Sequence, residues 1–241
     1  MKKRVIVVCF AILAANVFST ERPFPDGYYA LRDDMYNFAR TPKELEEAFN
    51  VYVQEAKSML SGYALNVALA RYEYILGRAY AYDGQNEKAA LHFDAGMDYA
   101  EKALAENYAI PAQLIYAENV SANCAVRPFS WVLLWGAKAL SFSKAILNAD
   151  ATNGAAFYMQ YAKDIFEPSP CKNYKRGIKE MTELLDTPTI VLDIDDRFNI
   201  LSAIGYAHLQ LKNKEEAKIW LEKALEIYPG NKFVLNLLSQ E

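Results

Sequence analysis

The sequence predicts an all-α protein, an irregular solenoid or bundle of antiparallel helix pairs with about ten helices. Apolar residues recur at spacings of three and four along most of the chain, and no run of alternating polarity is present. Such spacing places apolar side chains on one face of a helix, whereas a half-buried strand requires alternation. Glycine and proline lie mainly between segments of helix length, where they interrupt helices. Each helix therefore needs a neighbour that covers its apolar face.

The first 19 residues have the pattern of a secretory signal peptide. Basic residues at 2–4 precede an apolar run at 5–18, and the chain becomes polar from Ser19 onward. Val17 and Ser19 are small enough to allow cleavage after Ser19. The alternative is an uncleaved membrane anchor, but a span needs roughly 20 apolar residues and this run is shorter. We expect an exported protein, periplasmic or otherwise extracytoplasmic, with no membrane span after cleavage.

The chain has 241 residues and a formal charge of −4, and loss of the three basic leader residues lowers this charge by three, to −7. An acidic protein is a poor candidate for binding nucleic acid or anionic lipid. After the leader we expect an extended or partly helical lead-in at 20–40 and a single helical-repeat domain at 41–241. Cys124 and Cys171 either form a disulfide or lie apart as small buried groups.

The first helix of the domain is predicted to begin at Thr41 and to end near residue 60. Thr41 can cap this helix, Pro42 suits its first turn, and Glu44 can complete a capping box. Gly62 then interrupts the helical pattern. Further helices are expected at 65–82, 86–106, 112–122, 129–147, 155–166 and 174–185, followed by a closing pair within 199–231 and a short capping helix at 231–238.

Two helix pairs carry the same residue classes at the same separations, and they give the clearest repeats, at 70–106 and 198–231. In each pair, small residues allow the backbones to approach and apolar residues cover the shared face. Pro229 ends the last helix of the second pair because proline cannot extend the hydrogen-bond ladder. The repeat-defining residues are Leu76, Gly77, Tyr80, Ala89, Phe93 and Gly96, and then Ile204, Gly205, His208, Ala217, Leu221, Ala224 and Pro229. This pattern resembles the tetratricopeptide repeat, which implies stacked pairs that present a binding surface.

Tyrosine is unusually frequent, with 17 in the chain, and many of them crowd residues 63–116. Tyr74 and Tyr82 lie off the face that packs within the helix pair, so they are candidates to line a groove or pore between repeats. Trp131 and Trp135 lie one turn apart on one helix face. They form either a seam between helices or part of a ligand lining.

No enzyme, metal or cofactor motif is recognisable. His92 and His208 are the only histidines, and the sequence has no paired zinc-ligand spacing, phosphate-binding loop or nucleophile elbow. Asp193, Asp195 and Asp196 form the densest acidic cluster, but they lack the glycine turn and distal glutamate of a calcium loop. Acidic residues beside a helix amino terminus are favoured by the helix dipole, which explains this cluster without a metal. We predict no catalytic, cofactor-binding or metal site.

A looser resemblance covers most of the chain after the leader. It rests on segments 71–104, 131–136 and 153–157, on Pro168-Ser169-Pro170 and on the helix that begins at Tyr174. Their order is similar to that in the T component associated with tripartite ATP-independent periplasmic (TRAP) transporters, an exported helical protein with cryptic tetratricopeptide repeats. Two features differ, because no cysteine is placed for the lipid anchor of that family and Cys171-Lys172 stand where Gly-Gly is often found.

The first functional hypothesis is an exported, non-enzymatic module that binds another envelope protein or a peptide. The transporter resemblance implies a second, a periplasmic accessory protein that binds a solute-binding protein and a small hydrophobic or organic-acid ligand. A third hypothesis, an uncharacterised enzyme on a repeat scaffold, has no motif in its favour. The sequence leaves open the partner, the ligand, the oligomeric state and the exact cleavage site.

Overall fold

The computed structural model describes residues 24–167 and 172–239. These residues form the predicted all-α fold, with eleven helices and no strand. The helices are α1 (Asp26–Tyr36), α2 (Pro42–Met59), α3 (Gly62–Tyr82), α4 (Asn86–Glu106), α5 (Ile110–Val126), α6 (Phe129–Ala149), α7 (Gly154–Phe166), α8 (Tyr174–Asp186), α9 (Ile194–Gln210), α10 (Lys214–Ile227) and α11 (Lys232–Leu238). The expected signal peptide and Cys171 lie outside the described residues, so neither the export signal nor the disulfide alternative is tested. Cys124 is partly buried.

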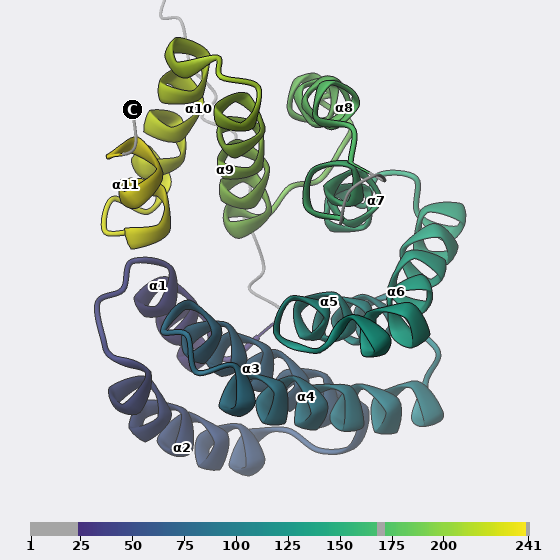
Figure 1. The fold of residues 1–241 in the computed structure, drawn as a ribbon. Coiled ribbons are helices and arrows are strands. Elements are labelled where there is room, and N and C mark those ends of the chain that lie inside the picture. The colour runs from purple at the N-terminus through teal and green to yellow at the C-terminus, as the bar shows by residue number, and fades with distance from the viewer. Residues whose placement is uncertain (1–23, 168–171, 240–241) are drawn as a thin grey trace, which may run out of the picture.

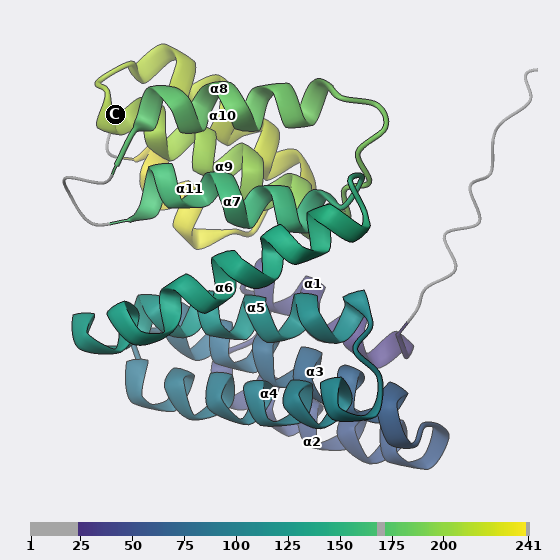
Figure 2. The same cartoon turned by 90° about the vertical axis from the view of Figure 1, so that its right-hand side faces the viewer.

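The first ten helices form five pairs that follow one another around a common centre, and α11 ends the series (Figure 1). In each pair the odd-numbered helix lies on the inside of this ring and the even-numbered helix on the outside. In the view from the side, α2 to α5 form one layer and α7 to α11 the other, and α6 runs obliquely between them (Figure 2). The irregular solenoid expected from the sequence therefore closes on itself.

Helix α1 closes the ring by packing against α9 and against the residues between α10 and α11. The Tyr36 ring stacks on the Tyr228 ring with their centroids 4.7 Å apart, and it meets the Phe198 ring edge-on at 5.2 Å. The Asn231 amide donates a hydrogen bond to the Tyr36 carbonyl at 2.7 Å, across a sequence separation of 195. Because Asn231 also caps α11, one buried side chain fixes both the last helix and the closure.

Glycine allows close helix crossing in both predicted repeats. A Cβ added at Gly77 would lie 2.6 Å from the Phe93 ring, and one added at Gly205 would lie 2.6 Å from the Leu221 side chain. Real carbon atoms do not approach so closely, so a larger residue at either crossing must displace its neighbour. The same kind of contact therefore joins α3 to α4 and α9 to α10.

The amino terminus of α2 agrees with its predicted capping box. The Thr41 hydroxyl accepts a hydrogen bond from the Glu44 backbone at 3.3 Å, and the Glu44 carboxylate accepts one from the Thr41 backbone at 2.8 Å. Pro42 occupies the first turn, where its missing N–H costs nothing.

The lead-in at 20–40, expected to be extended or partly helical, contains a regular helix at 26–36, because residues such as Leu31 are buried against the rest of the ring. Several helix boundaries differ from the prediction, and the helix expected at 112–122 extends from Ile110 to Val126. Helix α3 begins at Gly62 instead of Leu65, since glycine tolerates the φ of +53° found there. Helix α9 begins at Ile194, so the acidic cluster that was expected to precede this helix lies partly within its first turn.

Candidate binding site on the inner helices

The predicted repeat residues lie mostly inside the helix pairs. The buried members are Leu76, Gly77, Tyr80, Ala89, Phe93, Gly96, Ile204, Gly205, Ala217, Leu221 and Ala224. His208 is half-buried near the end of α9, where its Nδ1 lies 3.5 Å from Asn213 Nδ2 and burial lowers the pKa of the imidazole. Pro229 follows α10 and is exposed. These residues hold the helix pairs together. Because most of them are buried, a ligand would contact side chains outside the repeat pattern.

One such group lies on the inner face of α3. Tyr74, Arg78 and Tyr82 follow one another at four-residue spacing, which places them on the same face of the helix. Three other inner helices, α1, α7 and α9, each add one residue around Arg78. We call the set the inner cluster, and it consists of Tyr36, Tyr74, Arg78, Tyr82, Tyr158 and Asn199.

The Arg78 guanidinium is surrounded by uncharged oxygen atoms. Its Nη1 donates hydrogen bonds to the Tyr36 hydroxyl at 2.7 Å and the Tyr74 hydroxyl at 3.2 Å. Its Nη2 donates to the Tyr82 hydroxyl and, at 3.5 Å, to Asn199 Oδ1. The guanidinium also lies over the Tyr36 ring, 4.9 Å from its centroid, which adds a cation–π contact. Among the described residues, no carboxylate forms an ion pair with Arg78.

Two other arginines of the inner helices are each paired with an acid. Arg71 of α3 lies with Nη1 3.0 Å from the Glu118 carboxylate of α5. Arg32 of α1 lies with Nη1 3.4 Å from the Asp195 carboxylate of α9. The first pair joins α3 to α5, and the second joins α1 to α9 where the ring closes. Arg78 differs from both because neutral groups alone solvate its charge.

The acidic cluster lies at the amino terminus of α9, as the helix-dipole interpretation predicts. Asp193 caps the helix, and Asp195 and Asp196 lie in its first turn. Burial raises the pKa of Asp196 well above its usual range, and repulsion from Asp195 and Glu118 adds to this rise. Burial also raises the pKa of Asp195, although the attraction of Arg32 opposes it. No group of potential metal ligands is found in the described part of the chain.

The phenols of Tyr36, Tyr74 and Tyr158 remain protonated at neutral pH, because burial raises the pKa of each. Burial raises the pKa of Tyr74 to about 12, and it raises the pKa of Tyr158 further. A protonated phenol can accept a hydrogen bond from Arg78 and still donate its own proton to another acceptor. Tyr158 forms no hydrogen bond with any residue that the structure describes, and its side chain is only half-buried. The cluster therefore combines one cation with several hydroxyl donors.

The residues predicted to line a groove or pore, Tyr74 with Tyr82 and Trp131 with Trp135, lie at two separate places in the structure. Trp131 and Trp135 lie on the outer helix α6, where their rings stack with centroids 5.7 Å apart and planes 17° apart. Both rings are half-buried against a core cluster that includes Tyr116 of α5. Tyr74 and Tyr82 lie instead on an inner helix, beside Arg78. A groove-lining role for the tryptophans thus stays a prediction, on the outside of the ring.

Sequence reasoning missed most of the inner cluster. Arg78 could have been found, because it lies four residues from both Tyr74 and Tyr82 and must share their face. Tyr36, Tyr158 and Asn199 come from three other helices, and no local pattern connects them to α3. Tyr36 and Asn199 are 163 positions apart in the sequence, yet the Asn199 amide donates to the Tyr36 hydroxyl at 3.0 Å.

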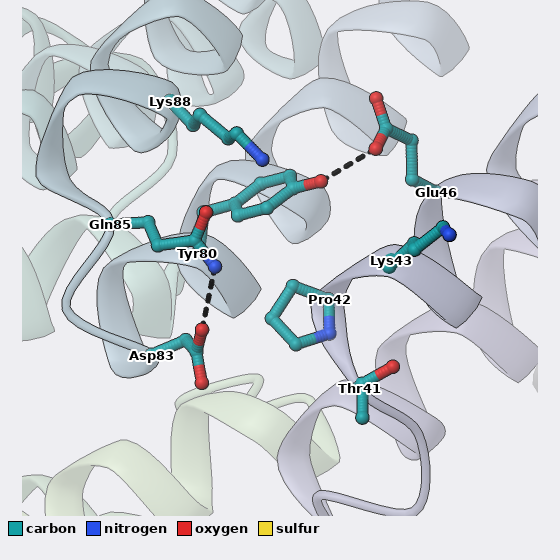
Figure 3. A pocket seen from close by; sticks show the side chains of 8 residues that line it. All are labelled: Thr41, Pro42, Lys43, Glu46, Tyr80, Asp83, Gln85 and Lys88. Atoms are coloured by element: carbon teal, nitrogen blue, oxygen red, sulfur yellow. Dashed lines mark hydrogen bonds between the residues drawn. The ribbon is translucent and has the colours of Figure 1, made fainter.

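A separate pocket of about 370 Å³ lies between the start of α2 and the turn from α3 to α4 (Figure 3). Inside it the Tyr80 hydroxyl donates a hydrogen bond to Glu46 at 2.6 Å, and Lys88 Nζ lies 4.8 Å from the centroid of the Tyr80 ring. Lys43 and Asp83 complete the mixture of charges. The pocket is open at the surface and holds both signs of charge in equal number, so it selects no obvious class of ligand.

The comparison with protein families supports the assignment of the last helix pair. Residues 198–231, which comprise most of α9, all of α10 and the turn that follows, match the tetratricopeptide repeat family. No curated protein and no solved structure matches the chain. None of the helices in the described ranges combines the length and the apolar character that a membrane span needs. The tetratricopeptide repeat and the helical-repeat fold indicate a protein-interaction module.

Proposed function

We propose that the protein is an exported, non-enzymatic helical-repeat module that binds another envelope protein, or a peptide segment of it, through the inner helices. The observation that carries this proposal is the inner cluster. Arg78 has no acidic partner among the described residues, so its charge attracts an acidic group of a partner, and the Tyr158 hydroxyl, which forms no hydrogen bond with a described residue, can bind that partner as well. Tetratricopeptide repeats act as a class by binding partners on stacked helices.

Affinity capture from the native cell envelope tests this proposal. The wild-type chain is compared with Arg78→Gln, which removes the charge at similar length, and with Arg127→Gln as a matched control. Arg127 pairs with Asp94 between α4 and α5, away from the inner cluster. We expect the same partner with the wild type and Arg127→Gln, and its loss with Arg78→Gln. Equal capture by all three chains contradicts binding at the inner cluster, and circular dichroism checks that each variant is folded.

A second candidate is a TRAP-type accessory protein that receives a small organic acid from a solute-binding protein. The unpaired charge of Arg78 favours an anionic ligand over a neutral one, because an arginine fork can bind a carboxylate through two hydrogen bonds. A ligand that binds the folded state raises the unfolding midpoint as its concentration rises. We expect mono- and dicarboxylates to raise the midpoint of the wild type but not that of Arg78→Gln. An equal rise in both chains contradicts this second candidate.

A further inference from the structure

Three large apolar side chains are exposed on α6, one of the outer helices. Phe129, Leu133 and Leu134 are 59%, 67% and 78% exposed, although residues of this size are usually buried. Farther along the same helix the exposed positions carry only small or basic side chains, and α6 contains no acidic residue. The exposed face thus has a bulky apolar end and a small, positively charged end. A patch of this kind on an otherwise polar surface is typical of a contact site.

The exposed face of α2 is complementary to that of α6 in charge. Glu47, Val51, Glu55 and Met59 follow one another at four-residue spacing and are all exposed, Val51 and Met59 at 64% each. This face alternates acidic and apolar side chains, whereas the α6 face combines apolar residues with lysines. Helices α3, α4 and α5 lie between α2 and α6 along the ring (Figure 1), so the two faces are presented to the outside at different places.

We propose that α6 of one molecule packs antiparallel against α2 of a second copy of this chain. When the two helices are aligned antiparallel, each apolar residue of α2 faces an apolar or small residue of α6. Each glutamate of α2 then faces a lysine of α6, so that four successive turns are matched. The register pairs Met59 with Leu133, Glu55 with Lys138, Val51 with Ser141, and Glu47 with Lys144. The contact is independent of the inner cluster and of the proposed function.

Charge selects this contact over symmetric alternatives. Two α6 faces packed together would form no acid–base pair, because α6 has no acidic residue, and the α2 positions named above include no base to pair with a glutamate of a second copy. Lys138 already lies 3.9 Å from Glu101 of its own chain, which weakens its contribution. Glu47 and Lys144 form no ion pair with any other described residue, so they are the cleanest pair to test. Because two different surfaces meet, the assembly is head-to-tail and forms either a closed ring or a filament.

Sedimentation velocity of the purified chain, measured across a wide concentration range, tests the proposal. The wild type is expected to form species larger than the 27.3 kDa monomer, and increasingly so at higher concentration and lower salt. Leu133→Gln removes the apolar contact with Met59 and is expected to weaken association by roughly tenfold or more. Leu91→Gln is the matched control, since Leu91 of α4 is 69% exposed and lies outside both faces.

A charge reversal gives the decisive result. Glu47→Lys and Lys144→Glu each replace an attraction with a repulsion, and we expect each to weaken association by about threefold or more. The double variant restores opposite charges and is expected to restore association toward the wild-type level. A monomer at every concentration overturns the proposal. So does a double variant that associates no better than either single one.

Discussion

The two pairs α3/α4 and α9/α10 share one packing device but differ in what their inner faces carry. In both, a glycine of the inner helix lies against a large side chain of the outer helix, Gly77 against Phe93 and Gly205 against Leu221. On its inner face, however, α3 carries cations and phenols, whereas α9 carries carboxylates at its amino terminus. The difference teaches that the repeat pattern specifies how a pair packs, while residues outside the pattern specify how pairs meet across the ring.

The largest expected effect comes from removing the large side chain at each crossing. Phe93→Ala is expected to lower the free energy of unfolding by about 3–5 kcal/mol, and Leu221→Ala by about 2–5 kcal/mol. Phe93 should matter more, because its ring also lies 6.2 Å from that of Tyr74 and so supports the inner cluster. Urea unfolding followed by circular dichroism measures both. If the free energy of unfolding were unchanged at either site, the two helix pairs would not depend on the same packing contact.

The reverse change, overfilling the crossing, is expected to have a smaller effect. Gly77→Leu and Gly205→Leu should each lower the free energy of unfolding by about 1–3 kcal/mol, because the new side chain must displace Phe93 or Leu221. Gly84→Ala, at a turn where an added Cβ meets nothing within 4 Å, separates crowding from backbone strain, since Gly84 has a φ of +76°. If both leucine variants were as stable as the wild type, this would contradict the close packing of the helices at Gly77 and Gly205.

The ring closure is tested by Asn231→Ala. This change removes the hydrogen bond to the Tyr36 carbonyl and the cap of α11, and we expect a loss of about 1–2 kcal/mol. Asn213→Ala is the matched control, because Asn213 precedes α10 without a side-chain cap hydrogen bond and is exposed. The control is expected to change stability by about 0.5 kcal/mol or less. Equal effects of the two changes would indicate that the closure contributes little.

The smallest expected effect depends on pH and concerns the acidic inner face of α9. Folding raises the pKa of Asp196, so the unfolded chain loses this proton first as the pH rises, and stability falls between the unfolded and folded pKa values. Asp196→Asn removes that titration while keeping an acceptor for the capping box. Its unfolding midpoint should exceed that of the wild type at pH 7 and approach it at acidic pH. An identical difference at both pH values would show that ionisation of Asp196 is not the cause.

Local signals explain why part of this structure was predictable. The capping box of Thr41 and Glu44 spans four residues, and the crossings at Gly77 and Gly205 follow from helical spacing within one pair. The inner cluster was only half predictable, since Tyr74 and Tyr82 stood out on α3 but their partners did not. Asn199 and Tyr36 belong to opposite ends of the chain, and sequence spacing says nothing about which helices meet across a ring.

The sequence by itself determined the helical class, the two clearest pairs and the small residues on which their packing depends, because each of these rests on contacts between residues close along the chain. Only the tertiary structure decided that α1 returns to the last pair and closes the ring. It also decided that Arg71 and Arg32 acquire acidic partners while Arg78 receives only neutral ones. Those outcomes depend on distances between helices that are remote in sequence, and no local pattern encodes them.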